Sequence, residues 1–152
     1  MNTTEKFLFT ELSSIINKLD ENRKPVFGQM TPQHMIEHLG GIFLISAGKV
    51  NVKHPDTAQV EKYYSWFRSP EFTFKPNTQS PAMPSGLPPL RFDSLEAAKM
   101  ALRKAVQKFK MQFEEQPQDK VVHPVFGPLD YQEWLRFHQV HTQHHLDQFE
   151  LS

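Results

Sequence analysis

The feature that most constrains this fold is an apolar face near the C-terminus that carries two histidines one helical turn apart. In this segment aromatic residues and histidines recur at steps of three and four, which places them on one face of an α-helix: Trp134, Phe137, His141, His145 and Phe149. A buried imidazole needs a partner for each ring nitrogen. Because His141 and His145 are four residues apart, they can share one divalent metal, so this face predicts a metal site inside the fold.

Four stretches have the apolar periodicity of amphipathic helices: residues 4–19, 31–48, 93–116 and 130–149. The last three begin with side chains that cap helices well, and the last start adds a glutamate three residues on, which predicts a capping box. A chain of 152 residues can bury a core of its own, so we expect a single domain over residues 1–152. Four such helices in one short domain predict an all-α fold, a four-helix bundle.

The segment between the second and third helices is rich in proline. We expect one short helix in it, over residues 57–67, followed by a stretch from 68 to 92 that holds half of the 12 prolines and excludes helix or central strand. This excursion is longer than an ordinary connection, so it is either a linker or a functional lid, and we expect it to shape a substrate pocket. Its apolar residues favour packing on the helices: Phe72, Phe74, Met83, Leu87, Leu90 and Phe92.

Two adjacent glycines, Gly40 and Gly41, lie in the middle of the second helix. Each lowers helix stability by about 1 kcal/mol relative to alanine. We therefore predict that they allow another backbone to approach this helix closely.

His38 is the candidate third ligand, because it lies among apolar neighbours on the second helix. A single buried histidine more often bonds a backbone carbonyl, and on its own that would be the preferred interpretation. A histidine pair on a facing helix changes the balance in favour of a shared metal. Three neutral imidazoles and a water match the open coordination of a catalytic metal.

The other histidines are assigned to different places. We predict that His138 and His144 are exposed at the surface. His54 and His123 each precede a proline, which fixes extended backbone, so both are expected in loops. His123 could there line the mouth of a pocket.

Residues 34–38 also match H-x-x-E-H, a pattern found in inverted zinc peptidases. Five residues give little specificity, and His34 would lie in the first, exposed turn of its helix. Glu37 should point about 100° away from His38 around the helix, so it receives no catalytic role here. We do not expect a peptidase.

Composition excludes several classes of partner. The chain has 17 basic and 17 acidic residues with no basic cluster, which argues against nucleic acid and against an anionic membrane surface. The N-terminus lacks the pattern of a signal peptide and no apolar run approaches a membrane span, so a cytoplasmic location is expected. Cysteine is absent, so any thiol chemistry would need a thiol from a cosubstrate.

Two sequence blocks resemble the DinB/YfiT-like metal-binding helical bundles. Residues 30–39 fit M-T-P-x-x-M-x-E-H-L, and residues 123–149 fit H-P-x-F-G-x-L, then W, then H-x-x-H-H-L-x-Q-F, as in one branch of that superfamily. The resemblance spans most of the chain and is weakest across the proline-rich middle. Many DinB-like proteins have H-x-x-x-H-R-G-Q in the last helix. Here Leu146 and Asp147 replace the Arg-Gly and Gln148 remains.

The resemblance implies an up-down-down-up four-helix bundle, often dimeric, with the excursion between helices two and three. The metal-binding histidines of the family correspond to His38, His141 and His145. Characterised relatives imply metal-dependent transfer or isomerisation that uses a low-molecular-weight thiol. A homodimer and a small-molecule substrate are therefore expected.

The chemistry of the site keeps alternatives open. Three imidazoles suit zinc or nickel first, with iron or copper as further candidates. A metal held this way can activate a thiol for attack on an electrophile, or activate water as a hydrolase does. A third interpretation is a metal-binding bundle without catalysis. No catalytic residue is assigned, and the three histidines are named as metal ligands only.

Overall fold

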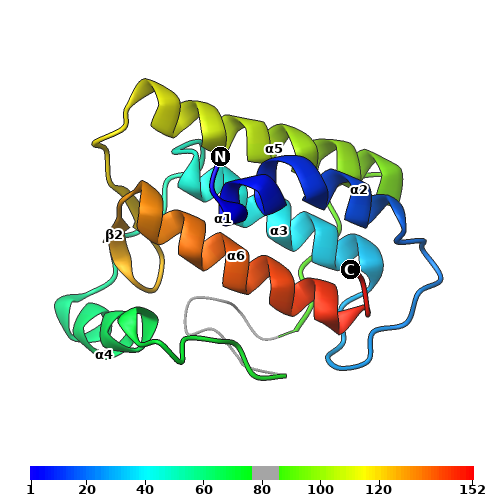
Figure 1. The fold of residues 1–152 in the computed structure, drawn as a ribbon. Helices are drawn as coiled ribbons and strands as arrows, with labels where there is room; N and C mark the ends of the chain where they lie inside the picture. The colour runs from blue at the N-terminus through cyan, green and yellow to red at the C-terminus, as the bar shows by residue number, and fades with distance from the viewer. Residues whose placement is uncertain (77–85) are drawn as a thin grey trace.

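The structure is a computed structural model that describes residues 1–76 and 86–152. Most of the described chain is helical, and its elements follow one another in this order: α1 (Thr3–Lys6), η1 (Phe7–Glu11), α2 (Leu12–Asn17), α3 (Pro32–Ser46), α4 (Thr57–Arg68), α5 (Leu95–Glu115), β1 (Val121–His123), β2 (Gly127–Leu129) and α6 (Tyr131–Gln148). The first helical run, α3, α5 and α6 lie side by side, whereas α4 lies next to the β-hairpin (Figure 1). Among the described residues, no helix has the length and apolar character needed to cross a membrane.

The first helical run is continuous from Thr3 to Asn17 and contains one π-helical turn, η1. It begins with a capping box, because the Asn2 side chain accepts a hydrogen bond from the Glu5 amide and the Glu5 side chain accepts one from the Asn2 amide. The sequence predicts the helix correctly but places its end at residue 19, two residues too late. Its apolar stripe is buried as expected: Leu8, Leu12 and Ile16.

Helices α3 and α5 pack closely where α3 carries Gly40. A Cβ atom added to Gly40 would lie 3.7 Å from the Cα atom of Leu102 on α5. The predicted close approach of another backbone is confirmed at this position. At Gly41 the nearest neighbour is instead the Arg91 guanidinium, 3.6 Å from such a Cβ.

We expect Gly40→Ala to leave the free energy of unfolding unchanged or to raise it by up to about 1 kcal/mol, because an alanine methyl fits and favours helix. Gly40→Leu should lower it by about 1–3 kcal/mol, because the longer side chain meets the α5 backbone. Urea unfolding measures both values. Gly41→Leu is the matched control and should cost less, because the Arg91 side chain can move aside. Equal losses of unfolding free energy in the two leucine variants would contradict the close approach of the α5 backbone at Gly40.

Helix α6 begins as the sequence predicts. The Asp130 carboxylate accepts a hydrogen bond of 2.9 Å from the Glu133 amide, and the Glu133 carboxylate accepts one of 3.1 Å from the Asp130 amide. This capping box fixes the first turn of the helix that carries His141 and His145.

A short antiparallel hairpin precedes α6, and the sequence interpretation missed it. Val121 pairs with Leu129 and His123 with Gly127, so His123 lies in strand β1 and not in the predicted loop. Three-residue strands are too short to show an alternating pattern. Gly127 has a φ of 78°, a left-handed conformation that glycine adopts without strain. A Cβ there would also lie 3.2 Å from Val60, so the same glycine lets α4 pack on the hairpin.

The predicted short helix is confirmed as α4. In the stretch that follows, Phe72 is buried and Phe74 is half-buried, as expected. The expected packing is wrong for Leu87, Leu90 and Phe92, which are 42%, 45% and 38% exposed. Their segment is attached to α3 by hydrogen bonds between its own backbone groups and α3 side chains instead of by apolar packing. Met83, Pro81 and Pro84 lie outside the described residues.

Candidate metal centre

Three histidines from two helices meet in a near-equilateral triangle. His38 comes from α3, and His141 and His145 come from successive turns of α6. The ring centroids of His38 lie 4.8 Å from those of His141 and of His145, and the centroids of His141 and His145 are 4.7 Å apart. One nitrogen from each ring lies within 4.8 Å of the others. The structure thus brings together the three residues that the sequence analysis names as ligands.

The triad is almost closed from solvent. His141 and His145 are each 7% exposed, and His38 is half-buried. Burial lowers the pKa of His38 to about 4 and that of His145 to about 3. Burial, together with the neighbouring imidazoles, also holds the pKa of His141 well below its ordinary value. All three rings are therefore neutral near pH 7, which is the state in which an imidazole nitrogen binds a metal.

The arrangement fits a divalent cation. The Nε2 atoms of His38 and His141 face each other at 2.9 Å. In a metal-free site, one of these two nitrogens therefore carries a proton and donates a hydrogen bond to the other. Zinc binds imidazole nitrogen at about 2.0–2.1 Å, so two nitrogens in a tetrahedral site are about 3.3 Å apart. The facing nitrogens are already close to that spacing. The chemistry of this donor set suits zinc, nickel, iron or copper.

Gln148 is a site residue to which the sequence analysis gives no role, although it is the retained Gln of the family motif. Its Oε1 atom lies 2.9 Å from Nδ1 of His145, and its Nε2 atom donates a hydrogen bond of 3.1 Å to the carbonyl oxygen of Phe27. The side chain is buried although it lies in the last turn of α6. Its position three residues after His145, on the same face of the helix, is the signal that could have identified it.

The rim beside the triad is aromatic. The ring of His144 lies between Phe27, with centroids 5.2 Å apart, and Phe74, at 5.6 Å. Phe74 also contacts the ring of His141 at 5.6 Å. The prediction that His144 is exposed is wrong, because these rings leave it half-buried, and burial lowers its pKa.

His138 is also wrongly predicted to be exposed. It is fully buried, its ring stacks on Phe43 at 3.8 Å, and its Nε2 atom lies 2.8 Å from Oγ of Ser46. The cause is the width of the buried face of α6, which contacts both α3 and the first helical run. His138 therefore belongs to the core next to the triad and not to the ligand cluster.

The remaining histidines do not belong to the ligand cluster. His123 is buried in β1, where its Nδ1 atom accepts hydrogen bonds from the amides of Val125 and Phe126. Burial lowers the pKa of His123 to about 3. It holds the hairpin turn and does not line a pocket mouth. His54 lies in a loop, as predicted.

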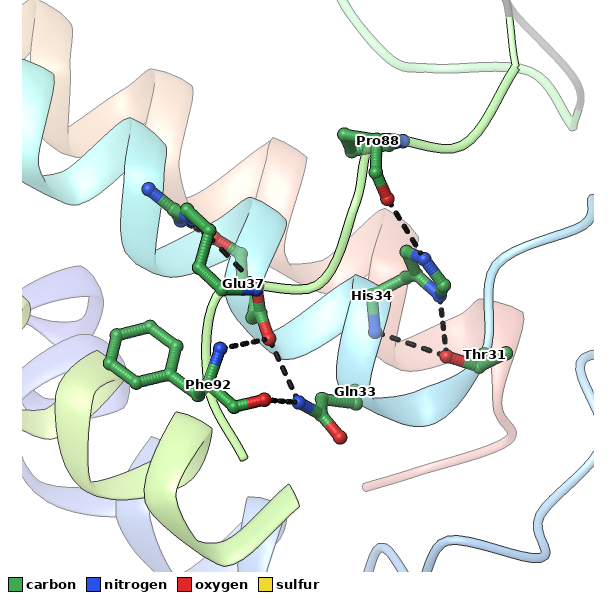
Figure 2. A network of polar contacts seen from close by, with 7 residues as sticks. Thr31, Gln33, His34, Glu37, Pro88 and Phe92 are labelled. Atoms are coloured by element: carbon green, nitrogen blue, oxygen red, sulfur yellow. Dashed lines mark hydrogen bonds and ion pairs between the residues drawn. The ribbon is translucent and has the colours of Figure 1, made fainter. Parts of the chain in front are cut away.

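The H-x-x-E-H residues serve another purpose (Figure 2). The His34 ring bonds the Thr31 hydroxyl at 2.6 Å and the Pro88 carbonyl oxygen at 3.1 Å, which occupies both nitrogens and leaves the residue half-buried, not exposed. The Glu37 carboxylate accepts hydrogen bonds from the amides of Arg91 and Phe92, at 2.7 and 3.3 Å.

This network attaches the segment before α5 to α3, because Gln33 also bridges Glu37 and the Phe92 carbonyl oxygen. Burial raises the pKa of the Glu37 carboxyl, but hydrogen bonds from Arg91, Gln33 and Phe92 outweigh this effect and hold it below its usual value. Glu37 therefore stays ionised as an anchor and does not face the triad.

Comparison with known proteins identifies the family. The model of the DinB superfamily matches residues 9–149 of this chain, which therefore belongs to that superfamily. No protein with a curated description and no solved structure gives a significant match. The matched range contains all three histidines of the triad.

Proposed function

We propose that this member of the DinB superfamily is a metal-dependent enzyme that activates a small thiol for attack on an electrophile. His38, His141 and His145 would hold one divalent metal, zinc or nickel first. The observation that carries the proposal is the neutral, nearly equilateral histidine triad. A cation bound there would lower the pKa of a thiol or water that reaches it.

The number of protein ligands favours a catalytic metal site over a purely structural one. Among residues 1–76 and 86–152, no other histidine or carboxylate joins the cluster. Three protein ligands leave a position for an exchangeable group, whereas structural zinc sites are usually closed by four. Because the sequence contains no cysteine, the thiol would come from a cosubstrate.

The protein supplies the surroundings of the reaction. His38 is the least buried residue of the triad, so a substrate would reach the metal from its side. Phe27 and Phe74 flank His144 beside it and would exclude water from an apolar electrophile. The low pKa values of the three ligands keep them unprotonated, so they remain available as ligands under mildly acidic conditions.

For the fold, we propose the up-down-down-up four-helix bundle of the resemblance, formed by the first helical run, α3, α5 and α6. Their side-by-side arrangement supports it (Figure 1). The chain between α3 and α5 would then be the proline-rich excursion, and a homodimer would be the working form.

The test compares consumption of a reactive electrophile by the zinc- or nickel-loaded protein with and without added low-molecular-weight thiols. We expect consumption above the uncatalysed rate that requires both metal and thiol and is lost in His38→Ala. Equal consumption without thiol would instead indicate a metal-dependent hydrolase. No consumption under either condition, with metal bound, would indicate a metal-binding module without catalysis.

A further inference from the structure

We infer that Gln148 is a positioning residue that fixes the tautomer and orientation of His145, so that Nε2 of His145 always faces the triad. The benefit of this role for metal binding rests on the proposed function. The hydrogen-bond chain itself exists without metal. The chain runs from His145 through the Gln148 amide to the backbone of the loop before α3.

The direction of each hydrogen bond follows from the last acceptor. The carbonyl oxygen of Phe27 can only accept, so the Gln148 group that faces it must be the NH₂ group. The other end of the same amide is then the oxygen, which can only accept, and it lies 2.9 Å from Nδ1 of His145. Nδ1 must therefore carry the proton. A neutral imidazole has one N–H, so the lone pair of His145 is on Nε2.

Among residues 1–76 and 86–152, neither of the other two ligands has such a hydrogen bond to its outer ring nitrogen. Nδ1 of His141 is buried and has no hydrogen-bond partner within the described chain. The Nε2 atoms of His38 and His141 face each other, so they can exchange roles as donor and acceptor. His145 is thus the ligand whose lone pair is already on Nε2 before a metal binds. Loss of a hydrogen bond that orients a ligand in this way typically lowers metal affinity 10- to 100-fold.

A purely structural role for Gln148 is the competing explanation. The Gln148 carbonyl oxygen accepts a hydrogen bond of 2.8 Å from the Val26 amide, and Arg23 donates one of 2.8 Å to the Phe149 carbonyl oxygen. These two contacts already hold the loop on the end of α6 and do not need the Gln148 side chain. The test must therefore separate the effect on His145 from the effect on the loop.

The test uses two substitutions of Gln148. Both remove the donor to the Phe27 carbonyl oxygen, and they differ in whether an acceptor for Nδ1 of His145 remains. Gln148→Glu keeps an acceptor for Nδ1, whereas Gln148→Met has a similar length and no acceptor. Gln143→Met is the control, because Gln143 is exposed on the same helix and its side chain bonds only Asp147 within the described part of the chain. The ¹⁵N chemical shifts of the His145 ring in the metal-free protein at neutral pH report the tautomer, and chelator competition reports zinc affinity.

We expect the Nδ1–H tautomer of His145 in the wild type, Gln143→Met and Gln148→Glu, and loss of that single tautomer in Gln148→Met. Zinc affinity should fall 10- to 100-fold in Gln148→Met and stay at or above the wild-type value in Gln148→Glu. An Nε2–H tautomer in the wild type, or the same tautomer in Gln148→Met, would overturn the inference. A wild type with the expected tautomer but no zinc binding would overturn the proposed function and leave the inference standing.

Discussion

Replacement of His38 by alanine is expected to abolish the stabilisation of this protein by divalent metal. A ligand that binds only the folded state at 1,000 times its Kd raises the free energy of unfolding by about 4 kcal/mol. For a chain of this size that corresponds to an increase in Tm of roughly 8–16 °C. The wild type should show this increase with zinc or nickel. His38→Ala should show almost none, because two imidazoles remain where three are needed.

His34→Ala is the matched control for this experiment. His34 lies one turn earlier on α3 and is also half-buried, but both of its ring nitrogens bond protein groups away from the triad. Its metal-induced increase in Tm should equal that of the wild type, even if its Tm without metal is lower. A loss of the increase in both variants would favour the H-x-x-E-H pattern, whose two histidines are His34 and His38. Retention of the increase in His38→Ala would refute the triad.

The metal-free protein is expected to lose stability steeply below pH 6.5. His123 is neutral in the folded state, where its pKa is about 3, and takes up a proton near pH 6.5 when unfolded. The unfolded state then binds more protons, so the free energy of unfolding falls as pH falls from about 6.5 toward 3. At pH 5 this single histidine lowers it by about 2 kcal/mol. His138, also buried with a pKa well below normal, acts in the same direction.

Urea unfolding at several pH values measures the slope of the free energy of unfolding against pH. The variant His123→Asn tests whether His123 causes this slope. An asparagine oxygen can replace Nδ1 as acceptor for the amides of Val125 and Phe126, but it does not take up a proton. The slope between pH 6.5 and 5 should fall by up to about 1.4 kcal/mol per pH unit. His54→Asn, at an exposed loop position, is the matched control for the substitution itself. An unchanged slope in His123→Asn would show that His123 already accepts a proton in the fold.

Local sequence patterns predict the helices and the two ligands on α6, because these features depend only on spacing along a single helix. The steps between His141 and His145 fix their common face, and Asp130 with Glu133 fixes where that helix starts. The partnership with His38 spans 103 residues and depends on how α3 packs against α6, which no local pattern contains. In the sequence, His38 is linked to this pair by its apolar neighbours and by the family resemblance, and not by spacing along one helix.

The failures have a common physical cause, since each residue is buried by an element far away in sequence. His138 looks like the polar neighbour of an apolar stripe, but α6 is covered from two sides and the residue lies in the core. His144 is enclosed by Phe27 and Phe74 from two separate connections. Gln148 receives no role in the sequence analysis, because one of its two partners, the Phe27 carbonyl oxygen, lies in the loop before α3.

The most direct measurement of the central claim is elemental analysis of the purified protein, after reconstitution with divalent metal and removal of excess, beside its His145→Ala variant. Three histidines that converge on one cation predict about one bound metal per wild-type chain and almost none in the variant. A metal-free wild type, or the same metal content in both proteins, would contradict the account.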